Sequence, residues 1–279
     1  MRRLIIRPGA IGDCISALPA MEFLRTGWTE VWVASQNVPL IRFADRVRAI
    51  ATTGLDLAGI PGREPPSALL ETLAGFDSIV SWYGANRPEF RAAVSGLPLE
   101  FLPALPAEPR ALTSGPGLHA ADFYLRQVGG GGGPAIPRIP CPRAPGEFAV
   151  IHPFSGSARK NWPLERYREL ACALATRMPV RWCAGPEEAL EDAVRFDDLY
   201  ELACWLASAR VYFGNDSGIT HLAAASGAPV VALFGPTDPA IWAPRCARVR
   251  IIATRRPGEP MENIPVAAVL EAGVWLGVA

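Results

Sequence analysis

The sequence has no excess of either charge, because 27 lysines and arginines are balanced by 27 aspartates and glutamates. Proteins that bind nucleic acid in general usually carry a basic surplus, so we expect no nucleic-acid partner. No apolar run approaches the roughly 18–20 residues of a membrane span. The first such run, Leu4 to Ile6, ends at Arg7 and is too short for a secretory signal. We therefore expect a cytoplasmic protein that contacts a membrane only at its surface, if at all.

The sequence also lacks the motifs of several other chemistries. The absence of GxGxxG weakens a nicotinamide or flavin site, and neither GxxxxGK(S/T), HExxH nor GxSxG occurs. No DxD occurs, so the sequence has no obvious carboxylate pair that could bind a metal ion on a diphosphate. We therefore predict no metal site. The six cysteines form no CxxC pair and no zinc spacing, so they are expected to be buried free thiols.

What is present indicates two domains of α/β class. A chain of 279 residues suits two domains of roughly 100–150 residues each. A run of five glycines, Gly129 to Gly133, is followed by prolines crowded between 134 and 145, and neither residue type supports a core element. We place the boundary here, giving domains 1–140 and 141–279. The alternative is a surface loop within one domain.

Strand and helix patterns alternate along both halves. Short apolar runs predict strands at 3–7, 30–34, 77–82, 148–152, 180–184, 211–213 and 230–234. Apolar stripes and capping signals predict helices at 13–25, 118–128, 163–177, 199–209 and 219–226. This alternation predicts parallel sheets with helices on both faces. Ligands bind such sheets outside the carboxyl ends of the strands, where four loops stand out.

The first of these loops is Pro8 to Asp13. Gly9 and Gly12 permit a ligand to approach the backbone closely. Asp13 falls at the start of the following helix, where an aspartate can be an N-cap. The other interpretation is a general base at the mouth of a cleft, and the sequence leaves both open.

The second loop runs from His152 to Pro163. Ser155 and Gly156 leave backbone N–H groups open to a phosphate, and Lys160 supplies a positive charge. The alternatives are a solvated lysine in a turn and a histidine with only a structural role.

The third loop, 214–221, starts another helix. Asp216 can cap this helix near Ser217, and Gly218 exposes amides at its positive end, which suits a diphosphate. His221 lies about one turn further on, within reach of the same ligand. In the fourth loop, 234–239, Thr237 either helps to line the cleft or only shapes a turn.

Four blocks of the sequence, in this order, resemble one known family. They are RPGAIGD (7–13) with LPA (18–20), HP (152–153) with KNWP (160–163), DSGITH (216–221), and FGPTDP (234–239). The family is glycosyltransferase family 9, the ADP-heptose:lipopolysaccharide heptosyltransferases. Each block is weak alone, but together they span nearly the whole chain.

The resemblance implies a GT-B fold, in which two Rossmann-like domains with parallel sheets face each other across a cleft and the last helix can pack back on the N-terminal domain. It implies an inverting, metal-independent glycosyltransferase without a cofactor. The enzyme would move a sugar, heptose from ADP-heptose, to a glycan or glycolipid hydroxyl, as in lipopolysaccharide core synthesis. It would act in the cytoplasm, with peripheral contact with the inner membrane.

The resemblance also implies residue roles. Asp13 would deprotonate the acceptor hydroxyl. The donor phosphates would be held by Ser155, Gly156, Lys160, Ser217, Gly218 and His221. The nucleotide or sugar would be contacted by Gly12, Asp216, Thr237 and either Glu187 or Glu188.

Two other functions fit the same loops. One is a GT-B-fold epimerase or hydrolase that acts on a sugar nucleotide, which incubation of donor without acceptor would reveal. The other is a non-catalytic sugar-nucleotide-binding protein, which would bind nucleotide without turnover on any acceptor.

Overall fold

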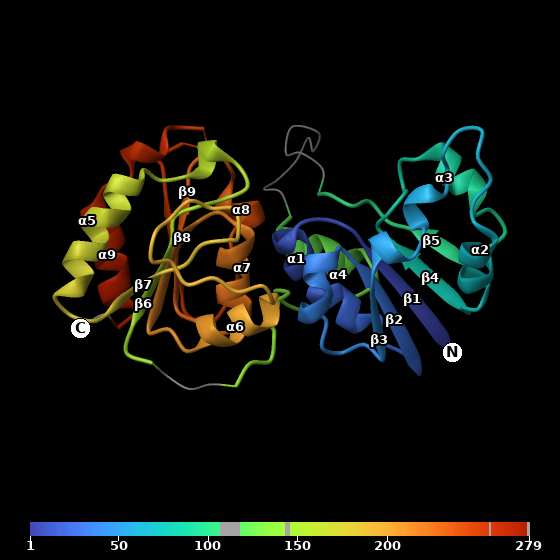
Figure 1. The fold of residues 1–279 in the computed structure, drawn as a ribbon, viewed down its shortest axis with the longest axis horizontal. Helices are drawn as coiled ribbons and strands as arrows, with labels where there is room; N and C mark the ends of the chain where they lie inside the picture. The colour runs from blue at the N-terminus through green and yellow to red at the C-terminus, as the bar shows by residue number, and fades with distance from the viewer. Residues whose placement is uncertain (107–117, 143–145, 257, 278–279) are drawn as a thin grey trace. The chain divides into compact units, whose positions relative to one another are not determined.

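The chain folds into two compact units, Met1–Ala135 and Ile136–Ala279 (Figure 1). A computed structural model of the protein describes residues 1–106, 118–142, 146–256 and 258–277. The two units divide between Ala135 and Ile136, whereas the glycine and proline pattern puts the domain boundary between Pro140 and Cys141. Each unit has its own parallel sheet and its own buried core.

The first unit is built around a five-stranded parallel sheet of order β3-β2-β1-β4-β5. Its strands are β1 (Arg2–Arg7), β2 (Trp28–Val33), β3 (Arg46–Ala49), β4 (Ser78–Ser81) and β5 (Leu99–Phe101). Its α-helices are α1 (Ile11–Phe23), α2 (Ser67–Ala74), α3 (Pro88–Ala93) and α4 (Ala120–Gln127). Short 3-10 helices follow β2 and β3, namely η1 (Ser35–Leu40), η2 (Ile50–Thr52) and η3 (Leu55–Leu57).

The alternation of side chains along β1 explains the layers of this unit. Leu4 and Ile6 point to one face, where they share a core with residues of α2 and α3. Ile5 and Arg7 point to the opposite face. Helices α1 and α4 cover that face, so the sheet lies between two helical layers (Figure 1).

The second unit repeats this plan with a five-stranded parallel sheet of order β10-β9-β8-β6-β7. Its strands are β6 (Ala149–His152), β7 (Val180–Trp182), β8 (Val211–Asn215), β9 (Val230–Phe234) and β10 (Val249–Ala253). Its α-helices are α5 (Leu164–Ala175), α6 (Leu199–Ala207), α7 (Gly218–Ala225), α8 (Pro239–Trp242) and α9 (Val266–Trp275). Two 3-10 helices are η5 (Ala158–Lys160) and η6 (Met261–Asn263).

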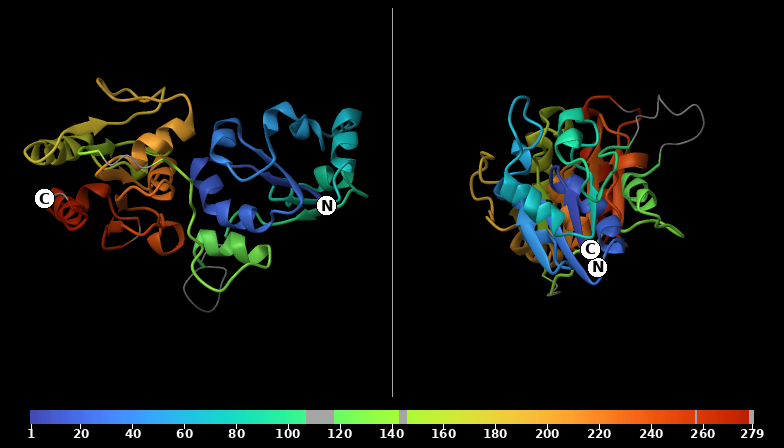
Figure 2. Two further views of the ribbon diagram at one scale, coloured as in Figure 1. Left: turned by 90° about the horizontal axis from the view of Figure 1, so that it is seen from below. Right: turned by 90° about the vertical axis from the view of Figure 1, so that its right-hand side faces the viewer.

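Helices α5 and α9 lie side by side on one face of the second sheet, while α6 and α7 lie on the other (Figures 1 and 2). Tyr167 and Leu170 of α5 share a core with Ile151 of β6 and with Val269 and Ala272 of α9. The last helix is therefore part of the second unit's core. Its packing on the first unit stays a prediction.

The predicted α/β class is confirmed by the two parallel sheets. Every predicted strand and helix coincides with an observed element, and Asp198 caps α6 as expected by accepting from the N–H groups of Tyr200 and Glu201. The apolar patterns do not predict β3, β5, β10, α2, α3, α8 or α9. Strands β3, β5 and β10 lie at sheet edges, and arginines interrupt the apolar run in two of them, which is common for edge strands.

Among the described residues, no helix is long and apolar enough to cross a membrane. The six cysteines are free, as expected, and Cys14 and Cys183 are buried. The expected burial is wrong for Cys172, which is exposed on α5.

Candidate functional site

Each sheet has one point where the strand order reverses. In the first sheet this point lies between β1 and β4, and in the second between β6 and β8. Loops that leave the carboxyl ends of neighbouring strands in opposite directions open a crevice, which is where such sheets bind ligands. Three of the four polar loops expected from the sequence follow β1, β6 and β8, so both units place them at these points, and the fourth follows β9.

Asp13 lies in the first turn of α1, not at its N-cap. The helix begins at Ile11 with Ala10 as N-cap, and Gly12 and Asp13 are its second and third residues. The carboxylate reaches back, and its Oδ2 accepts from Ala10 N–H at 3.0 Å. The side chain is 29% exposed. The N-cap interpretation is therefore wrong in position, although the carboxylate still satisfies a backbone donor of the first turn.

Gly9 allows this close approach of the loop to Asp13. Its φ is +116°, which L side chains rarely adopt. A Cβ at position 9 would also lie 2.8 Å from Cβ of Asp13. The glycine is thus required by the packing of the loop on the carboxylate.

The loop after β6 presents Ser155, Gly156 and Lys160. The Ser155 hydroxyl lies 2.8 Å from Ser157 O and 2.7 Å from Asn161 Oδ1, and can donate to one of them at a time. Gly156 is exposed, and a Cβ there would meet nothing within 4 Å. The space beside its backbone is therefore open to a ligand.

Asp216 lies close to polar side chains from the loops after β6 and β9 and from α7. Its Oδ2 lies 2.6 Å from Lys160 Nζ and accepts from Thr237 Oγ1 at 2.6 Å. His221 Nε2 lies 3.9 Å from Oδ1. The sequence suggests that Asp216 caps α7, but this is wrong. Ser217 caps the helix instead, by accepting from Thr220 N–H at 3.3 Å. The reason is that α7 begins at Gly218, one residue later than an Asp216 cap requires.

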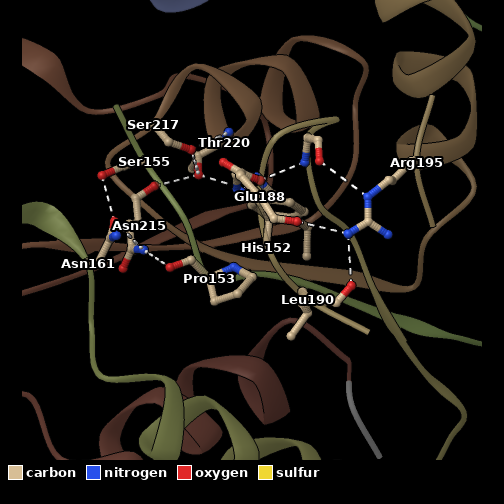
Figure 3. Close-up of polar contacts among 12 residues, drawn as sticks. His152, Pro153, Ser155, Asn161, Glu188, Leu190, Arg195, Asn215, Ser217 and Thr220 are labelled. Atoms are coloured by element: carbon tan, nitrogen blue, oxygen red, sulfur yellow. Dashed lines mark hydrogen bonds and ion pairs between the residues drawn. The ribbon is translucent and has the colours of Figure 1, made fainter. Parts of the chain in front are cut away.

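Asn215 was not singled out from the sequence, yet it ties two of these loops together (Figure 3). It is 0% exposed at the end of β8. Its Oδ1 accepts from Trp162 N–H at 3.0 Å and from the Tyr167 hydroxyl at 2.9 Å. Its Nδ2 donates to Pro153 O at 2.8 Å. The amide of Asn215 thus fixes the loop after β6 to the end of β8, beside the ion pair of Lys160 with Asp216.

The two glutamates after β7 differ in their surroundings. Glu188 Oε2 lies 3.1 Å from His152 Nε2 and accepts from Gly185 N–H at 2.6 Å (Figure 3). Arg195 donates to the carbonyl oxygens of Glu188 and Leu190 at 2.9 and 2.8 Å, which fixes the loop. Glu187 is exposed. Of the two candidates, Glu188 is the one held at the carboxyl edge of the sheet.

The acidity of Glu188 follows from these contacts. Burial alone would raise the pKa of its carboxyl. Hydrogen bonds from His152 and Gly185 N–H, together with the charges of His152 and Arg195, outweigh burial and lower the pKa below its ordinary value. The ionised carboxylate therefore stabilises the fold above the pKa of the unfolded chain. That contribution is lost as the pH falls through the lower, folded value.

Glu188→Gln should therefore destabilise the protein more at about pH 6 than at about pH 3, because near the lower pH the wild-type carboxylate is itself becoming protonated. Urea midpoints measured across this range check the prediction. Glu187→Gln is the matched control, since its exposed carboxylate contacts none of these groups. A gap between wild type and Glu188→Gln that stays constant with pH would contradict the assignment.

The second unit brings together most of the site residues expected from the sequence. Those of the loops after β6, β7, β8 and β9 all lie at the carboxyl ends of these strands. Gly12 and Asp13 lie in the first unit, and their approach to the donor loops is part of the proposal below. Within the described residues, no group of three or more His, Cys, Asp or Glu side chains is placed to hold a metal ion.

Comparison with solved structures identifies the fold. Solved structures similar to this chain include E. coli heptosyltransferase WaaC with ADP, at a TM-score of 0.70 and 19% identity over 99% of this chain and 100% of that one. E. coli ADP-heptose lps heptosyltransferase II gives a TM-score of 0.72 and 18% identity over 99% and 98%. At these identities the likeness concerns the fold, which is the GT-B fold of glycosyltransferases.

Sequence comparison finds similarity to one family in part of the chain. Residues 135–265 match the model of glycosyltransferase family 9 (heptosyltransferase), which confirms the resemblance for this part of the chain. Lipopolysaccharide heptosyltransferase 1 of Escherichia coli (strain K12) is 32% identical over 145 residues, 47% of this chain and 44% of the relative. The same enzyme of Salmonella typhimurium is 35% identical over 107 residues, 34% of each chain. The matches thus cover less than half the length of these curated relatives.

Proposed function

We propose that the chain is an inverting, metal-independent glycosyltransferase that moves heptose from ADP-heptose to a hydroxyl group of the lipopolysaccharide core. The observation that carries the proposal is the cluster at the start of α7, where Lys160, the α7 amides and Asp216 meet. The relatives named as lipopolysaccharide heptosyltransferases supply the sugar and the acceptor class.

The donor diphosphate would bind between the loop after β6 and the start of α7. The open backbone at Gly156 and the N-terminal amides of α7 at Gly218 offer N–H donors. Ser155 and Ser217 add hydroxyls, and Lys160 adds a positive charge. These groups offer the leaving diphosphate the stabilisation that a metal ion supplies in other enzymes.

The nucleoside and sugar would be oriented by the acidic groups beside this cradle. Glu188, held by His152 and Gly185, is the better candidate than Glu187 for accepting from the ribose hydroxyls. Asp216 and Thr237 lie next to Lys160, with His221 one turn along α7, where a sugar attached to the diphosphate would begin. Gly12 would leave room for the donor beside α1.

Asp13 would be the general base. Its carboxylate takes the proton of the acceptor hydroxyl as that oxygen attacks the anomeric carbon of heptose. The bond from this carbon to the phosphate oxygen breaks, and ADP leaves with the electron pair. A single displacement inverts the anomeric centre. This step needs the two units to close on each other and exclude water, as domains 1–140 and 141–279 would do in a GT-B enzyme.

The acceptor would be a glycolipid of the cytoplasmic membrane, met from the cytoplasmic side. The enzyme would therefore work in the cytoplasm with peripheral contact at the inner membrane.

Titration calorimetry with ADP, GDP and UDP, followed by turnover of ADP-heptose on a heptose-free lipopolysaccharide, tests the proposal. We expect ADP to bind and mass spectrometry to find one added heptose for each ADP released. Hydrolysis or epimerisation of ADP-heptose without acceptor would replace the proposal with a sugar-nucleotide hydrolase or epimerase. Nucleotide binding without turnover would replace it with a non-catalytic binding protein.

Lys160→Met should weaken ADP binding by about 30-fold, the loss of one hydrogen bond to a charged group. The loss has a second cause, because Asp216 then faces the diphosphate without its cation. Calorimetry measures the change in Kd. Arg168→Met, which removes an exposed charge on α5, is the control and should bind ADP normally. Equal Kd values for Lys160→Met and wild type would remove Lys160 from the donor site.

A further inference from the structure

Arg7 is a charged residue that the fold buries completely. It ends β1, on the face that α1 and α4 cover, and is 1% exposed. Moving a guanidinium out of water costs several kcal/mol unless opposite charge and hydrogen bonds offset it. In the sequence, Arg7 ends an apolar run and opens the RPGAIGD block, but neither pattern gives it a role, so its burial needs an explanation.

The guanidinium of Arg7 holds both ends of the loop that carries Asp13. Its Nη1 donates to Pro8 O at 2.9 Å, and its Nη2 donates to the backbone carbonyl of Asp13 at 3.2 Å. The same Nη2 lies 4.0 Å from Oδ1 of the Asp13 carboxylate. The planar guanidinium presents two N–H groups in a fixed fork to these carbonyls, whereas an ammonium group is a point charge on a flexible stem.

A second element also packs against the guanidinium. The Tyr124 ring of α4 lies with its centroid 4.6 Å from the central carbon of Arg7. The Tyr124 hydroxyl donates to Ala104 O at 2.9 Å, which fixes the ring. Within the described residues, Arg7 Nε has no hydrogen-bond partner. The side chain is thus held mainly by the loop and the ring.

The neighbours of Arg7 leave Asp13 as its counter-charge. Burial raises the pKa of the Cys14 thiol to about 12, more than the charge of Arg7 lowers it. Burial likewise raises the pKa of the Tyr124 hydroxyl. Both groups are neutral near pH 7, so among the described residues the carboxylate within 4.0 Å of Arg7 is that of Asp13.

We propose that Arg7 is the positioning residue of the base: its fork, braced by Tyr124, fixes the loop from Pro8 to Asp13 and aims the Asp13 carboxylate at the acceptor hydroxyl. This inference rests on the proposed role of Asp13. Arg7 itself is buried and touches no substrate, so its loss should lower kcat and leave the affinity for the donor unchanged.

Arg7→Lys and Arg7→Met test the inference, with kcat, the Kd for ADP and the thermal midpoint measured for each. A misplacement of about 1 Å at a reacting group costs about 100-fold in rate, so we expect kcat to fall about 100-fold in Arg7→Met. Arg7→Lys should fall less, and both should bind ADP as wild type does. Millimolar guanidinium should partly restore turnover to an Arg7→Ala variant, because it can refill the space beside Tyr124.

Arg3→Met is the matched control. Arg3 lies four residues before Arg7, on the same face of β1. Its side chain also donates to a backbone carbonyl, Leu24 O at 2.8 Å, which is not part of the loop that carries Asp13. It should keep its kcat. Wild-type kcat in Arg7→Lys, or in a folded Arg7→Met, would overturn the inference.

A second readout separates this inference from the proposed function. Asp13 Oδ2 accepts from Ala10 N–H, so loss of the positioning residue should speed hydrogen exchange at the Ala10 amide about tenfold or more, for a lost bond of about 1.4 kcal/mol. NMR measures this without any substrate. Inactive wild-type protein would overturn the proposed function alone, whereas unchanged exchange at Ala10 in both Arg7→Lys and Arg7→Met would overturn the positioning role.

Discussion

Replacing Asp13 by asparagine is expected to abolish heptose transfer while leaving ADP binding unchanged. The amide has nearly the same shape, and its oxygen can still accept from Ala10 N–H. Arg7 loses its counter-charge but keeps its hydrogen bonds to the backbone carbonyls of Pro8 and Asp13, so the loop stays in place. The amide cannot take a proton from the acceptor. General bases contribute about 10²–10⁴-fold to rate, so kcat should fall by about 10³-fold.

Asp122→Asn is a closely matched control for this experiment. Asp122 is also the third residue of a helix in the same unit, α4, and its Oδ1 accepts from a backbone N–H, that of Ala135, at 2.7 Å. The two variants lose the same charge at the same helical position. Transfer should survive in Asp122→Asn, and similar kcat values for the two variants would remove Asp13 from the mechanism.

Asn215→Ala is expected to destabilise the second unit and to weaken ADP binding together. The change leaves Trp162 N–H, the Tyr167 hydroxyl and Pro153 O without their partner in a buried place. Leaving a buried polar group unpaired costs about 1–3 kcal/mol, so with some relaxation we expect about 3 kcal/mol in total. The loop after β6 then keeps the Lys160–Asp216 ion pair but loses its contacts with the end of β8, so the groups proposed to bind phosphate lose their alignment.

Urea unfolding gives the loss of stability, and calorimetry below the unfolding transition gives the loss of ADP affinity. Asn263→Ala, at an exposed asparagine of η6 in the same unit, is the control and should change neither quantity. An Asn215→Ala protein as stable as wild type would show that water or a rearranged side chain replaces the amide.

The fold could be predicted largely from local patterns, because the central strands are apolar runs bounded by turns. Runs such as Val230 to Phe234 are buried on both faces and are recognisable without any partner. Strand β3 is not recognisable in this way. Arg46 and Arg48 alternate with apolar residues there, and only pairing with β2 identifies the segment as a strand.

The candidate site could be predicted as a set of loops but not as a set of contacts. Glycines and polar residues after strands mark the loops around Gly156 and Gly218, because parallel strands bring their ends to one edge. The partner of Asp216 could not be predicted, since Lys160 reaches it only once β6 and β8 are neighbours. Asn215 is an ordinary residue in sequence, and its role depends on three groups that folding brings around it.

The pairing of Lys160 with Asp216 has a consequence for selectivity. In the free protein the ammonium group is already neutralised by an internal carboxylate at 2.6 Å. An incoming anion must compete with that carboxylate for the same cation, so a small ion that offers one contact gains little. A diphosphate that also reaches the amides of α7 and Gly156 would form several contacts while displacing only the one between Lys160 and Asp216. If the donor binds as proposed, the carboxylate of Asp216 would thus favour a donor with several anionic contacts over free phosphate.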